Sequence, residues 1–153
     1  MAETILRIDE LNKVFVSKGV ELRAVNNLSL EVKKGETVGI VGESGCGKST
    51  LGRCIVHCYK PTSGDILYHS PEGAEYNIAT IDKRTLKKVR KEIQMIFQDP
   101  YSSLNPRMSV YDILSEPLKV NFQLTRNEQE DKVKAIAEKV GLNPSHLKRY
   151  PHA

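Results

Sequence analysis

The sequence predicts an α/β fold built around a phosphate-binding loop. An unbroken match to the spacing G-x-x-x-x-G-K-[ST] begins at Gly42 and ends at Ser49. A continuous apolar run at residues 38–41 precedes the match, and residues 51–58 after it place apolar side chains at helical spacing. Because such a loop functions between a strand and a helix, both flanks support the motif.

Each residue type in this loop has a physical task. Glycines let the backbone bend so that successive N–H groups point at a phosphate. The ammonium of Lys48 can reach the β- and γ-phosphates of a nucleoside triphosphate, and the hydroxyl of Ser49 can ligate Mg²⁺. We interpret Cys46 as a small loop residue, because it occupies an unspecified position of the motif. We therefore expect ATP and Mg²⁺ to bind at one segment, which comprises Gly42, Glu43, Ser44, Gly45, Cys46, Gly47, Lys48, Ser49 and Thr50.

Composition excludes several classes of protein. The chain has 153 residues, of which 39% are hydrophobic and 27% charged, as in ordinary globular domains. Its three cysteines have no zinc or disulfide spacing. The net charge of +4 includes one basic cluster at residues 83–91, which we interpret as the solvated face of a helix and not as a nucleic-acid site. No apolar run approaches the roughly 18 residues of a membrane span, so we expect membrane contact only through a partner.

Periodicity predicts the elements of the first part of the chain. Alternating apolar residues predict antiparallel strands at residues 5–16 and from 21, with a turn at Lys18 and Gly19. Buried strands are expected at residues 37–41 and 93–97, and a helix after the loop ends before Pro61. A further strand is expected at 65–68, with a turn at 70–73 and a return strand at 76–81. Asp82 is expected to cap a short helix that ends at Val89.

The last third of the sequence has a helical pattern. Ser109 and Asp112 have the spacing of a capping box ahead of a helix that we expect Pro117 to close. Thr125 and Glu128 repeat the same spacing ahead of a second helix, which ends at Gly141. We expect one face of the second helix to carry Val133, Ile136, Ala137 and Val140.

A second motif carries a resemblance to a known family. Residues 95–107, with the sequence MIFQDPYSSLNPR, resemble the Q-loop region of ABC transporter ATPases. Together with residues 41–53 they resemble the ATP-binding subunits of oligopeptide and dipeptide importers. The resemblance implies the P-loop NTPase core of an ABC ATPase at residues 37–60 and 93–98. It further implies an antiparallel β subdomain at 1–36 and 65–81 and part of the α-helical subdomain at 100–153.

The resemblance also implies roles for residues outside the loop. Gln98 would contact Mg²⁺ and the attacking water and sense the γ-phosphate. Gln98 would therefore be a catalytic residue, as would Lys48, and Gln98 would also contact the metal. An acidic residue at the end of an apolar strand, as at Asp99, is the general form of a magnesium-holding acid, but the Q-loop resemblance assigns this position to the loop. Phe15 would stack on adenine. The segment 101–117 resembles the part that receives a coupling helix of the membrane subunit.

The implied function is that of a peripheral subunit at the cytoplasmic face of the cell membrane. It would energise peptide import through transmembrane permease subunits, paired with a second ATPase subunit as homodimer or heterodimer. In the family, the segment resembling residues 146–152 leads into the signature, the Walker B glutamate and a switch histidine. Because these are absent from the 153 residues, we expect a truncated domain that does not hydrolyse ATP alone. Two alternatives stay open: the ATPase of an importer for nickel or an oligosaccharide, and a non-hydrolysing nucleotide-binding module.

Overall fold

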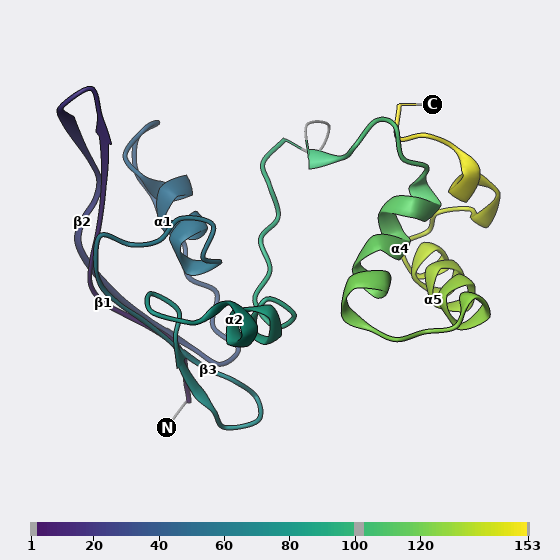
Figure 1. Cartoon of the computed structure of the whole chain (residues 1–153), viewed down its shortest axis with the longest axis horizontal. Helices are drawn as coiled ribbons and strands as arrows, with labels where there is room; N and C mark the ends of the chain where they lie inside the picture. Colours follow the sequence, from purple (N-terminus) through teal and green to yellow (C-terminus); the bar gives the residue numbers. More distant parts are fainter. Residues whose placement is uncertain (1–2, 100–102, 153) are drawn as a thin grey trace. The chain divides into compact units, whose positions relative to one another are not determined.

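The computed structural model describes residues 3–99 and 103–152. The chain divides into two compact units, Met1–Met95 and Ile96–Ala153 (Figure 1). The first unit holds a four-stranded sheet and two helices, and the second holds helices. The phosphate-binding motif lies in the first unit.

The sheet of the first unit is antiparallel throughout, with the strand order β2-β1-β3-β4. Its strands are β1 (Thr4–Ser17), β2 (Val20–Lys33), β3 (Ser63–His69) and β4 (Glu75–Asn77). The predicted hairpin at Lys18 and Gly19 is confirmed, and both residues have positive φ angles. The return strand β4 is shorter than expected. Asn77 explains this, because its side-chain oxygen accepts hydrogen bonds from the backbone N–H groups of Ile66 and Ala79.

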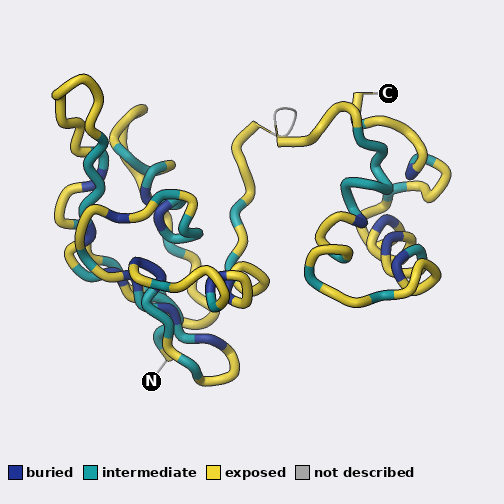
Figure 2. Tube along the Cα trace, in the orientation of Figure 1, coloured by how far each residue is buried: buried dark blue, intermediate teal, exposed yellow. Residues whose placement is uncertain are grey.

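Helix α1 (Lys48–Ile55) packs on the sheet through Leu51 and Cys54, which are 2% and 0% exposed. Their partners include the fully buried Ile8 and Ile66. Figure 2 colours the buried segments of the first unit dark blue. Burying one such side chain contributes about 2 kcal/mol, so these contacts hold α1 against the sheet. The helical spacing expected for residues 51–58 does not extend to Cys58, because α1 ends at Ile55 and leaves the Cys58 side chain exposed.

Helix α2 (Lys83–Val89) begins where the sequence predicts. The Asp82 carboxylate accepts hydrogen bonds from the backbone N–H groups of Arg84 and Thr85, at 2.8 and 3.1 Å. Leu86 and Val89 anchor the helix, being 8% and 2% exposed. The N-cap prediction is therefore confirmed.

The two buried strands expected beside the phosphate loop are not formed. Residues 37–41 and 93–97 have no strand assignment, and Val41 and Ile96 are each 96% exposed. A strand is stabilised by hydrogen bonds to a neighbour, and the sheet among the described residues contains only β1 to β4. The apolar composition of these segments is typical of strands, but none of the described residues pairs with them.

The second unit packs helices α4 (Val110–Asn121), α5 (Arg126–Lys139) and the 3₁₀ helix η1 (Pro144–Lys148). Both capping boxes are confirmed. The Ser109 hydroxyl accepts from the N–H of Asp112 at 3.1 Å, and that of Thr125 accepts from the N–H of Glu128 at 3.4 Å. The described core comprises Val133, Ala137 and Leu147.

Two details of these helices differ from expectation. Helix α4 continues past Pro117 to Asn121, because Leu118 packs against the core of the unit and this burial offsets the missing proline hydrogen bond. Ile136 and Val140 do not share the buried face of α5, since they are 43% and 70% exposed.

Candidate phosphate-binding site

The geometry of the loop requires glycine at Gly47 and leaves little room for a larger residue at Gly42. Gly47 has a φ of 99°, and a Cβ there would overlap the carbonyl oxygen of Ala24 and lie 3.1 Å from its carbon. A Cβ on Gly42 would lie 2.6 Å from the Sγ of Cys46. Gly45 also has a positive φ, 85°, but open space surrounds it. Strand β2 and the loop therefore approach each other closely at Ala24 and Gly47.

Helix α1 begins directly after the loop and has no side-chain cap. Its N-cap is Gly47, and no acidic residue lies in its first turn. Its first backbone hydrogen bond runs from the N–H of Leu51 to the carbonyl of Gly47, at 2.9 Å. The preceding N–H groups of the first turn consequently have no partner within the helix. Together with the positive end of the helix dipole, they form a site for an anion.

Lys48 is folded over the loop. Its Nζ donates to the carbonyl oxygens of Gly42 at 2.7 Å and Glu43 at 2.6 Å, and lies 3.5 Å from the Sγ of Cys46. The ammonium is thus held at the loop by polar groups that a phosphate can replace, because phosphate oxygens accept the same hydrogen bonds and add opposite charge. The loop is a cradle that fits the phosphates of a nucleotide.

A cavity of about 360 Å³ opens at the cradle. Loop residues line one side of it, and β2 supplies others, among them Arg23 and Ala24. Arg23 was missed by sequence reasoning. It belongs to no phosphate-binding motif, and only the close approach of Ala24 to Gly47 shows that β2 borders the loop. Arg23 adds a second cation to the wall of this cavity.

Few side chains at this cavity could act as ligands of Mg²⁺. Ser49 is exposed on the first turn of α1, and Thr50 beside it is half-buried. None of the described residues that line the cavity is acidic. Across residues 3–99 and 103–152, no group of three or more His, Cys, Asp or Glu side chains is arranged to bind a metal. The Ser49 hydroxyl is therefore the candidate ligand from the loop.

Phe15 lies against another aromatic ring. Its ring meets that of Tyr59 edge to face, with centroids 5.3 Å apart and planes at 83°. The Nζ of Lys13 lies 4.8 Å from the centroid of Phe15. These contacts hold the ring in place, and the stacking of adenine on Phe15 stays a prediction.

Gln98 belongs to the second unit, where its side chain is exposed, as is that of Asp99. Its assignment to Mg²⁺ and water stays a prediction. Part of the segment expected to receive a coupling helix, residues 101 and 102, lies outside the described residues. No helix in residues 3–99 and 103–152 combines the length and apolar character needed to cross a bilayer.

The chain is similar to known proteins over most of its length. The family model described as ABC transporter matches residues 25–152. The chain is 44% identical over 158 residues to the oligopeptide transport ATP-binding protein AppF of Bacillus subtilis, covering 98% of this chain and 46% of AppF. It is 43% identical over 156 residues to the di/tripeptide transport ATP-binding protein DppF of Pseudomonas aeruginosa, covering 98% of this chain and 47% of DppF. The chain thus spans about half the length of the curated relatives it matches.

Solved structures show the same fold. The ATP-binding cassette MJ0796, in a dimeric post-hydrolysis state bound to ADP and Pi, superposes with a TM-score of 0.78 at 22% identity, covering 97% of this chain and 62% of that one. The cbiO1 protein of Clostridium perfringens, part of the transporter complex cbiONQ, gives a TM-score of 0.71 at 28% identity, covering 99% and 55%. The partial ABC ATPase fold expected from the sequence is confirmed. Since the family model matches most of the residues, the chain belongs to the ABC transporter family.

Proposed function

We propose that this protein is an ATP-binding subunit that energises the import of peptides through an ABC transporter. The phosphate cradle carries the proposal. It combines a helix N-terminus without a side-chain cap, a close approach of strand β2 that only glycine permits at Gly47, and the Lys48 ammonium held at the loop by hydrogen bonds. The peptide class rests on the relatives, which are named as oligopeptide, dipeptide and di/tripeptide transport proteins.

Different residues of the chain would contact the phosphates, the metal ion and the base of ATP. Backbone N–H groups at the start of α1 and the Lys48 ammonium would hold the β- and γ-phosphates, and Ser49 would supply a hydroxyl to Mg²⁺. Phe15 would support the base, and Gln98 would orient water near the γ-phosphate. Mg²⁺, when bound, neutralises charge that develops on the phosphate oxygens during transfer.

The partners follow from the same proposal. An importer subunit acts on transmembrane permease subunits at the cytoplasmic face of the membrane and works with a second ATP-binding subunit. This second subunit is either another copy of the same protein or a related one. ATP binding would thereby be coupled to the movement of peptide.

The first experiment tests nucleotide binding at the cradle. Lys48→Ala removes the ammonium aimed at the phosphates, and we expect titration calorimetry to detect no MgATP binding to this variant. Lys60→Ala, which removes another lysine charge of the same unit at an exposed position, is the matched control and should retain wild-type affinity. Equal affinities of Lys48→Ala and the control would refute the assignment of the loop.

The second experiment tests the transported class. In the source organism, a Lys48→Ala replacement in the gene should abolish uptake of a labelled tripeptide and leave nickel and oligosaccharide uptake unchanged. Loss of nickel or oligosaccharide uptake with normal tripeptide uptake would contradict the peptide assignment and support the related importer.

A further inference from the structure

Helix α2 concentrates the positive charge of the molecule. Residues 83–91 contain six Lys or Arg residues and no Asp or Glu, whereas the whole chain has a net charge of +4. The remaining residues therefore carry a net formal charge of −2. The positive character of this chain is local, and a local field of this kind attracts an anionic surface.

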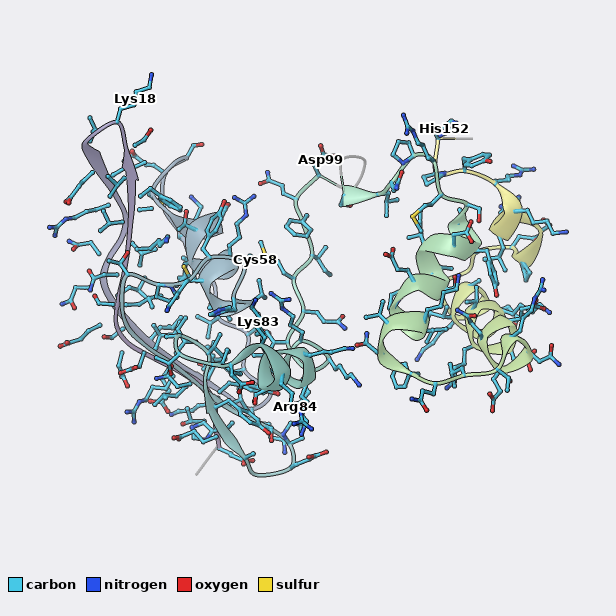
Figure 3. All side chains as sticks on the ribbon, in the orientation of Figure 1. Lys18, Cys58, Lys83, Arg84, Asp99 and His152 are labelled. Atoms are coloured by element: carbon cyan, nitrogen blue, oxygen red, sulfur yellow. The ribbon has the colours of Figure 1, made fainter. Side chains whose placement is uncertain are left out.

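The charges lie on one side of the helix. At about 100° per residue, Lys83, Arg84, Lys87 and Lys88 fall within one arc, which we call the basic face. Leu86 and Val89 lie outside that arc and are buried, whereas all four residues of the basic face are exposed. Figure 3 shows the labelled side chains of Lys83 and Arg84 at helix α2. Packing against the sheet thus fixes the direction in which the basic face points.

The acidic side chains of the described residues do not neutralise the basic face. In residues 3–99 and 103–152, Lys83, Arg84, Lys87 and Lys88 form no ion pair with an acidic side chain. The two nearest acids along the chain have other partners. Asp82 caps the helix, and Glu92 accepts a hydrogen bond from the Tyr68 hydroxyl at 2.8 Å. The repulsion among neighbouring like charges is therefore left for an external anion to relieve.

The chemistry of the basic face favours a membrane surface. None of its residues lines the cavities of about 360, 460 and 610 Å³ in the described part of the chain, and all four are exposed, as contact with an extended surface requires. Residues 82–92 contain no aromatic side chain on which a base could stack. Long, mobile cationic side chains on a convex helix suit a plane of lipid phosphates, and clusters of this size are typical of anionic-lipid binding.

We propose that the basic face of α2 docks on the anionic headgroups of a phospholipid bilayer. This contact is additional to any made through a permease, and it gives the basic cluster a role beyond that of a solvated helix face. The docking proposal rests on the proposed function in one respect, which is that an importer subunit works beside a membrane. Because vesicle binding requires no nucleotide, its outcome is separate from that of the Lys48 experiment.

The test is cosedimentation of the 153-residue chain with vesicles at 0.05, 0.15 and 0.5 M NaCl. One set contains phosphatidylcholine alone, and the other contains about 30% phosphatidylglycerol. We expect binding only to the anionic vesicles, weakening steeply as salt screens the charges. Each cation near such a surface strengthens binding by a factor of about five, so the four substitutions together should weaken it by about 600-fold.

The variant is Lys83→Gln, Arg84→Gln, Lys87→Gln and Lys88→Gln together, and glutamine preserves helix propensity. The matched control removes the same charge from exposed positions elsewhere by Lys18→Gln, Lys60→Gln, Lys132→Gln and Lys139→Gln. Circular dichroism checks that both variants fold, and the salt dependence of the unmodified chain tests the proposal without any variant. Equal loss in the variant and the control, or equal binding of the unmodified chain to neutral and anionic vesicles, would overturn the proposal. Binding to a labelled DNA duplex without binding to vesicles would also overturn it and would identify a nucleic-acid surface.

Discussion

Replacing Gly47 by alanine tests whether the close approach of β2 to the loop shapes the phosphate site. The added methyl overlaps the carbonyl oxygen of Ala24, so the loop or β2 has to move. Relieving such an overlap takes a shift of about 1 Å, and a misplacement of that size in a preorganised site costs about 100-fold in function. The φ of 99° adds strain of about 1–2 kcal/mol for a residue with a Cβ.

Gly45→Ala is the matched control for this substitution. Gly45 shares the positive φ, at 85°, but a Cβ there meets no atom within 4 Å. The control therefore carries the conformational strain without the overlap. We expect Gly45→Ala to weaken MgATP binding by at most about 30-fold, the upper limit that strain of about 1–2 kcal/mol allows.

Titration with a fluorescent ATP analogue measures the affinity of both variants, and urea unfolding measures their stability. If Gly47→Ala binds as tightly as Gly45→Ala while both remain folded, the contact between Ala24 and the loop does not determine the site. A loss confined to stability, with unchanged affinity, would likewise refute the reasoning.

Further predictions concern the base, the cavity wall, the helix caps and turnover. Phe15→Ala should weaken ATP by about 1–3 kcal/mol and leave inorganic triphosphate binding unchanged, as calorimetry would show. Arg23→Gln should weaken ATP by about 1 kcal/mol in the same assay, since it removes a cation that lines the cavity. Hydrogen bonds from their capping hydroxyls hold the pKa values of Asp112 and Glu128 below the ordinary values of 3.8 and 4.5. Their stabilisation is present above those values and is lost as pH falls through the lowered folded-state pKa, so acid titration of helicity should show a loss below about pH 4. In a phosphate-release assay, the 153-residue chain should give no ATP turnover above that of Lys48→Ala, because no acidic residue lines the described cavity.

Features set by a few neighbouring residues could be predicted from the sequence. The cap at Asp82 and the box at Ser109 form as expected, because each depends on a side chain and backbone groups within three residues. The hairpin at Lys18 and the uncapped start of α1 are equally local. The spacing of the motif therefore sufficed to predict that a helix begins at its end, near Lys48.

Features set by contacts distant in the sequence could not be predicted in the same way. Arg23 reaches the cavity because β2 passes the loop, and no periodicity in β2 signals that proximity. Helix α4 continues past Pro117 because Leu118 finds a partner in the core of its unit. In both cases tertiary packing determines the structure. The local sequence gives no signal for the position of Arg23, and at Pro117 it predicts the end of the helix.

The cradle and Gln98 differ in whether they need the apolar segments at 38–41 and 93–97 to form strands. Continuous apolar runs are typical of strands covered on both faces, yet Val41 and Ile96 are each 96% exposed. The cradle itself rests on contacts within the first unit, namely Gly47 with Ala24 and α1 with the sheet, so its geometry does not require those segments to form strands. Gln98 follows the second segment directly, and a side chain is held in a productive position only when its own backbone is fixed. The proposed phosphate site is therefore built from residues of the first unit, whereas residues 93–97, which lead to Gln98, have no strand pairing in the described sheet.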